Sequence, residues 1–270
     1  MTLFNTVLAF LIRDWRIRRS YRASWFIGIA HLLFAVTSFF FVSRLVDSRA
    51  PSALTPYGGA YFPFVFFGLL VSRWFSVCLS SVGGALRGEQ LQGTLEALSA
   101  SPLRLPVLVA GTLLWELLWA TLEVAVVLGI GVVVFGVDLG RLNVLSCSVV
   151  SVLTALCLSG LGVFAASGVL LFQDADPTSW VLDGLMKLAG GVFVPVAILP
   201  GWLQTVAKGL PMTYGLEGVR QAVIMGRPLH ELSAVCAMLA ISAAVLWPAS
   251  LAALSWVMNR LKAAGALSFR

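Results

Sequence analysis

Long apolar runs separated by short polar segments make up most of this 270-residue chain. A transmembrane helix needs about 20 predominantly apolar residues to cross roughly 30 Å of hydrocarbon. Six runs meet that length, at residues 24–43, 61–86, 105–135, 143–172, 179–199 and 232–258. The pattern therefore predicts an all-α polytopic membrane protein, a single transmembrane domain over residues 1–270 with six transmembrane helices.

An amphipathic segment precedes the first run, within residues 1–23. One helical face holds Phe4, Val7, Leu8, Leu11 and Trp15, and the opposite face holds Thr2, Asn5, Thr6, Arg13 and Arg16. This spacing predicts a helix that lies flat on the membrane surface. Because basic residues gather here and again after the last run, both termini are expected on the cytoplasmic side, which an even number of crossings allows.

A second polar segment, Arg87 to Pro102, separates the second and third runs with the sequence RGEQLQGTLEALSASP. On a helical wheel, Leu91, Leu95 and Leu98 fall on one face and Glu89, Gln92 and Glu96 on the other. A proline disfavours helical geometry in the residue before it, so the helix should end ahead of Pro102. The pattern predicts a short amphipathic helix outside the lipid, at about residues 87–101.

The same segment resembles a known family. Its residues Glu89, Gly93, Thr94, Leu95, Glu96, Leu98 and Pro102 resemble the E…GTLE.L…P motif that follows the second span of type-2 ABC transporter permeases. The resemblance implies that the segment is a cytoplasmic coupling helix that docks on a separate ATPase subunit, which would bind the ATP and Mg²⁺. The implied docking residues are Glu89, Gln92, Gly93, Thr94 and Glu96. A second copy of the permease, identical or related, is also implied.

A second resemblance lies between the fifth and sixth runs. The sequence from Leu210 to Arg220 resembles the lP..y.le..R segment of the same family, which implies short re-entrant helices on the outer side. The positions that carry it are Pro211, Tyr214, Glu217 and Arg220. The residues alone also allow an ordinary interfacial loop with a surface ion pair, because Glu217 and Arg220 are three residues apart.

Ionisable residues inside the apolar runs are costly, at about 3 kcal/mol each on insertion scales. Arg73 lies in the second run, and Glu116 and Glu123 share one face of the third because they are seven residues apart. These three line the central pathway or pair across spans two and three; alternatively, they form a structural polar pair or lie near the interface. Asp183 and Lys187, four residues apart, predict a local helix ion pair.

Composition excludes several function classes. Hydrophobic residues make up 59% and charged residues 11% of the chain, which is far from a soluble domain. The net charge of +6 is explained by arginines that flank apolar runs, so no nucleic-acid partner is expected. No GxxxxGK[ST], HExxH or GxSxG motif occurs in the sequence, so we expect no catalytic residues, no metal site and no cofactor on this chain.

These observations predict the membrane-spanning subunit of an ATP-driven ABC exporter in the plasma (inner) membrane. The apolar pathway suits an amphipathic small molecule, such as a drug or antibiotic in multidrug export, or a lipid. Two alternatives stay open: an exporter of a lipid-linked glycan, and a membrane carrier or structural protein without ATP coupling. The carrier is less favoured, because carriers often contain two related halves and no internal repeat is visible here.

Overall fold

The protein is described by a computed structural model, in which residues 22–46, 52–57, 59–91, 93, 105–172 and 177–264 are placed. Helices and connecting turns make up these ranges, and they contain no strand. The predicted surface helix within residues 1–23 lies outside the described residues, except for its last positions, which belong to the first helix. The all-α prediction is confirmed for the part of the chain that is described.

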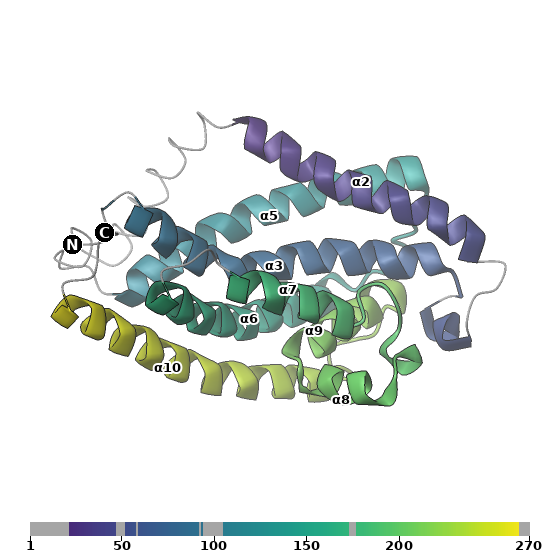
Figure 1. Cartoon of the computed structure of the whole chain (residues 1–270). Coiled ribbons are helices and arrows are strands. Elements are labelled where there is room, and N and C mark those ends of the chain that lie inside the picture. Colours follow the sequence, from purple (N-terminus) through teal and green to yellow (C-terminus); the bar gives the residue numbers. More distant parts are fainter. Residues whose placement is uncertain are drawn as a thin grey trace.

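Five long helices form the body of the bundle (Figure 1). They are α2 (Arg22–Val46), α3 (Tyr61–Leu91), α5 (Leu105–Phe135), α6 (Val144–Phe172) and α10 (Ser233–Ala264). Within the described ranges, these five helices are long and apolar enough to cross a membrane. They correspond to five of the six predicted runs, since hydrocarbon thickness fixes the length of such a run.

The fifth predicted run, over residues 179–199, is not one continuous helix in the structure. A helix of 13 residues, α7 (Pro177–Ala189), occupies its first half. At 1.5 Å per residue it extends about 20 Å, too short to cross the hydrocarbon alone. The helix ends because Gly190 and Gly191 follow it, with Gly191 at a φ of +83°, and Pro195 comes soon after.

Short elements continue the chain after α7. A 3₁₀ turn, η3 (Val196–Ile198), precedes α8 (Gly201–Gly209) and α9 (Pro211–Ile224), and another, η2 (Ser52–Tyr57), precedes α3. In Figure 1, α6 and α10 run in the same direction, so the chain between them returns along the bundle. The returning part of the chain consists of α7 and the non-helical residues that follow it. Helices α8 and α9 lie at the end of the bundle where α10 begins. We call this end, which also holds the α5–α6 connection, the loop end.

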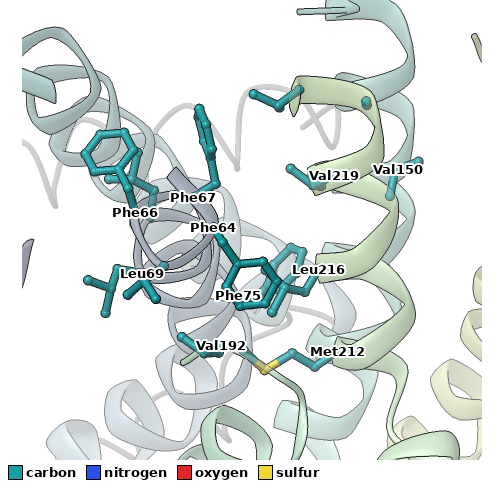
Figure 2. Close-up of a cluster of buried hydrophobic side chains, with 14 of the residues drawn as sticks. Phe64, Phe66, Phe67, Leu69, Phe75, Val150, Val192, Met212, Leu216 and Val219 are labelled. Atoms are coloured by element: carbon teal, nitrogen blue, oxygen red, sulfur yellow. The ribbon is translucent and has the colours of Figure 1, made fainter. Parts of the chain in front are cut away.

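Helix α3 lies at the centre of the bundle and packs against α2, α5, α6, α7 and α9. Phe64, Phe66 and Phe75 of α3 are fully buried. Figure 2 shows this cluster with Val150 of α6 and with Met212, Leu216 and Val219 of α9. By contrast, α2, α5 and α10 expose large apolar side chains such as Phe34, Val133 and Ile241, as helices that face lipid do.

Small residues allow α6 to approach its neighbours closely. A Cβ atom added to Gly162 would lie 2.5 Å from the Cys78 carbonyl oxygen of α3, and one on Gly160 would lie 3.1 Å from Leu246 of α10. Without a hydrophobic driving force between helices in lipid, close backbone packing supplies much of their association. Helix α6 therefore holds α3 and α10 together through its glycines.

Candidate functional site

Arg220 forms the centre of a polar cluster at the loop end. It comes from α9 and is only 2% exposed. Its guanidinium donates from Nε and Nη2 to the Phe64 carbonyl at 3.2 and 3.0 Å, from Nη1 to the Gly191 carbonyl at 2.7 Å, and from Nη2 to the Val192 carbonyl at 2.9 Å. It also stacks over the Phe64 ring at 3.5 Å. A planar guanidinium with five N–H groups suits such a set of acceptors, whereas an ammonium does not.

Two of the three carbonyl acceptors are available because α7 stops. Gly191 and Val192 follow the break, so their oxygens have no later helical turn to bond them. In a water-poor interior each unsatisfied carbonyl would be costly, and Arg220 satisfies both. Gly68 of α3 leaves the space for this contact, because a Cβ there would lie 2.5 Å from both Arg220 Nη2 and the Val192 oxygen.

Glu217 lies one turn before Arg220 but has different partners. Its carboxylate accepts the Tyr57 hydroxyl at 2.5 Å and the Gln221 amide at 2.7 Å. The surface ion pair considered from the sequence is therefore not what the structure shows, since Arg220 is buried and directed at carbonyl groups. Glu217 instead fixes α9 to η2, an element about 160 residues earlier.

Burial within this cluster shifts the pKa values of two of its groups. Burial raises the pKa of Tyr57 well above its ordinary value of 10, and the hydrogen bond and charge of Glu217 add to the effect. Burial also lowers the pKa of Arg220 to about 9, although Glu217 and Tyr57 oppose the change. At neutral pH, Tyr57 thus stays protonated and donates, and Arg220 stays charged.

A cavity of about 390 Å³ adjoins the cluster. Its walls include Tyr57, Phe64, Pro195, Thr213, Glu217 and Arg220. The other two predicted positions of this segment have structural places: Pro211 begins α9, and the Tyr214 hydroxyl donates to the Lys208 carbonyl at 2.7 Å, which fixes α9 to α8. All four sequence-predicted residues of the segment thus belong to one neighbourhood.

A second polar group lies between the long helices. Arg73 of α3 donates to Glu123 of α5 from Nη2 at 2.7 Å and from Nε at 3.1 Å. Glu123 is 4% exposed, and Gly28 of α2 packs directly against its carboxylate. Arg73 and Glu123 therefore form an ion pair across the second and third spans, at a point where three helices meet. Glu116 lies two turns away on α5 and is partly exposed.

A third group joins α3 to α7. Lys187 pairs with Asp183 at 2.6 Å, so the predicted local ion pair is confirmed. Asp183 also accepts the Ser76 hydroxyl of α3 at 2.5 Å. Sequence reasoning missed Ser76, because a serine in an apolar run carries no signal of its partner. Among the described residues, no cluster of three or more His, Cys, Asp or Glu side chains is arranged to hold a metal ion.

The predicted coupling segment is only partly described. Helix α3 continues through Arg87 and Glu89 to Leu91, so these residues form the end of a span rather than the start of a separate helix. Gly93 follows at a φ of +69°, and its N–H donates to the Gln90 carbonyl at 3.1 Å, as a glycine that ends a helix does. Leu91, which belongs to the apolar face of the predicted helix, is 61% exposed, whereas Gln90 is buried.

Three of the predicted docking residues, Gln92, Thr94 and Glu96, lie outside the described residues. Of this set, the structure therefore places Glu89 in the last turn of α3 and Gly93 just beyond it. Leu91 and Leu105, the described residues on either side of this segment, lie at the end of the bundle opposite the Arg220 cluster, since α3 begins beside that cluster and runs away from it (Figure 1). The segment and the cluster are thus at opposite ends of one helix.

Two comparisons with known proteins bear on the identity of this chain. The search of curated proteins finds no match for this chain. The sequence profile of the family described as ABC-2 type transporter matches residues 7–224, which include α2 to α9 and the segment after α3. The chain therefore belongs to the ABC-2 type transporter family and is the membrane-spanning permease component of an ABC transporter.

Proposed function

We propose that this permease works as an exporter driven by a separate ATPase subunit, through the segment that follows α3. The observation that carries the proposal is the position of this segment. It joins two full-length spans whose facing ends, Leu91 and Leu105, lie opposite the Arg220 cluster, and its residues Gly93, Thr94 and Glu96 resemble the family's docking motif. Helix α3, which is central in the bundle, leads directly into it.

The orientation and partners follow from this proposal. The segment faces the cytoplasm, both termini lie on that side, and the Arg220 cluster lies on the outer side of the plasma (inner) membrane. Two permease subunits form the pathway, and two ATPase subunits bind ATP and Mg²⁺. In this arrangement α8 and α9 are the re-entrant outer elements, since they are too short to span and lie at the loop end.

The substrate we propose is an amphipathic small molecule, such as a drug or antibiotic, or a lipid. The small number of fixed charges supports this choice: Arg73 of α3 is neutralised by Glu123 of α5, and Lys187 of α7 is neutralised by Asp183. A strongly charged solute would find little compensation along these helices, and a lipid-soluble one needs none. A lipid-linked glycan, the alternative substrate, combines a lipid anchor with a polar head. Measuring which candidate substrate stimulates ATP hydrolysis distinguishes it from the other substrates.

The test is co-purification of the chain in nanodiscs with candidate ATPase subunits, followed by ATP hydrolysis with and without substrate. We expect a stable complex, and we expect Thr94→Pro to abolish substrate stimulation because proline disrupts helical geometry in the docking segment. Thr94→Ser is the matched control and should behave as the unmodified protein does. Unchanged stimulation in Thr94→Pro, with the complex intact, would refute coupling through this segment.

A further inference from the structure

A groove runs along the bundle between two consecutive helices. Helices α5 and α6 are joined by a short connection, yet they make almost no direct contact, because each packs against α3. The space between them is a groove of about 370 Å³. Phe67, Val71 and Trp74 of α3 form its floor, Leu128 of α5 one wall, and Ser151 and Val152 of α6 the other.

The groove belongs to the half of the membrane nearest the loop end. Phe67 lies six residues after the start of α3 and Trp74 seven residues further, so the groove floor extends about 10 Å along the helix axis. This depth falls within the roughly 30 Å of hydrocarbon, where no bulk water is available to fill an open groove. An apolar occupant is therefore required.

Two polar groups of the groove already have partners, and most of the other lining side chains are apolar. The Trp74 indole N–H donates to the Thr121 hydroxyl at 2.9 Å, and that hydroxyl donates to the Leu117 carbonyl at 2.7 Å. A polar ligand would form few hydrogen bonds in the groove in return for its lost hydration, whereas a hydrocarbon chain has no hydrogen bonds to lose. The lining favours an acyl chain over a polar solute.

A cation lies in the connection above the groove. Arg141 is exposed, and it is flanked by Leu139 and Leu142, both of which line the groove. Within the described part of the chain no carboxylate pairs with it; the nearby Asp138 instead accepts the backbone N–H of Gly140 at 2.8 Å. Arginine forms charge-assisted hydrogen bonds with phosphate, and basic residues at the interface attract lipid headgroups.

We propose that this groove holds one acyl chain of a phospholipid whose phosphate lies at Arg141. The lipid completes the packing of α3 where α5 and α6 diverge. The proposal rests on the membrane placement of the chain and not on export or ATP coupling. A failed coupling experiment therefore leaves it standing, and its own failure leaves the proposed function untouched.

The experiment uses the full chain in nanodiscs that contain a phospholipid with a photoactivatable diazirine in its acyl chain. After illumination, mass spectrometry maps the labelled peptides. We expect label to concentrate on the groove-lining parts of α3 and α6, and we expect Ser151→Trp, which fills the groove, to remove most of it. Val133→Trp on the exposed face of α5 is the matched control and should leave the groove label unchanged.

Arginine variants test the headgroup contact without disturbing the packed interior. Arg141→Gln should lower groove labelling, whereas Arg227→Gln, at an arginine paired with Glu231, should not. Equal labelling of all exposed helix faces, or full groove labelling in Ser151→Trp, would show annular lipid only and overturn the proposal. A short thiol crosslinker could instead join the Cys147 residues of two copies of the chain while the groove stays unlabelled by the lipid probe. That result would identify a second copy of the chain as the occupant of the groove and would overturn the lipid proposal.

Discussion

Replacement of Gly68 by alanine tests whether the Arg220 cluster holds the broken crossing together. The added Cβ would lie 2.5 Å from both the Arg220 Nη2 atom and the Val192 carbonyl oxygen. Neither neighbour can move freely, because Arg220 is bonded to three carbonyl groups and Val192 belongs to the backbone beside the α7 break. The substitution must therefore separate α3 from the arginine.

The expected loss of stability in Gly68→Ala has two parts. Overpacking of a filled interior costs about 1–3 kcal/mol. Lengthening one or two hydrogen bonds of a buried charged donor costs a further ~1–3 kcal/mol. A decrease of about 3 kcal/mol in the free energy of unfolding is therefore expected, since alanine offsets less than about 1 kcal/mol through its higher helix propensity.

Gly84→Ala is the matched control on the same helix. No atom lies within 4 Å of a Cβ added there, so we expect unchanged or slightly greater stability. Thermal unfolding can be followed with a thiol-reactive dye, because Cys78 and Cys157 are fully buried and become reactive only on unfolding. Equal melting temperatures for the two alanine variants would refute the argument that Gly68 makes room for the guanidinium.

Three further predictions concern the polar groups. Arg220→Lys should lower stability by about 2 kcal/mol because an ammonium cannot reach all three carbonyls, whereas the exposed Arg227→Lys should change it little; similar melting of the two would contradict this. Glu123→Gln should cost about 2 kcal/mol by leaving Arg73 without its anion, and a double-mutant cycle with Arg73→Met should show coupling; additive effects would disprove the pair. Tyr57→Phe should cost about 1 kcal/mol. Because the pKa of Tyr57 is raised in the folded protein, its contribution is full below pH 10 and decreases above it, so the difference in melting should narrow in alkaline buffer.

Most of the long helices could be predicted from the sequence, because membrane thickness sets their length. The third run, 105–135, has the same bounds as α5. The prediction of one continuous span over residues 179–199 is wrong, because hydropathy counts Gly190, Gly191 and Pro195 as compatible with a span, although the helix ends before them at Ala189. The second run ended too early, since α3 continues past the polar Arg87 to Leu91.

The sites were less predictable because their partners are distant in sequence. Arg73 and Glu123 were each visible as charges within apolar runs, but their pairing depends on the axial register of α3 against α5. The role of Arg220 could not be read from a helical wheel, which showed only Glu217 three residues earlier. Its acceptors are backbone carbonyls, and backbone groups carry no sequence signal. Two of them, those of Gly191 and Val192, become available only because α7 ends.

The break after α7 adds two costs that a continuous helix would avoid. Carbonyls left free in a membrane interior must find donors, and the donor used here is a buried arginine, itself expensive in lipid. The buried arginine satisfies the free carbonyls only because Gly68 leaves room for the guanidinium to reach both Phe64 and Val192. The residues at the break also line the 390 Å³ cavity, which includes Gly190 and Pro195 in its walls. Because a Cβ on Gly190 would overlap the Met186 carbonyl oxygen and Gly191 has a φ of +83°, we expect alanine at either position to disturb the acceptors of Arg220 and to affect transport more than insertion of the long helices.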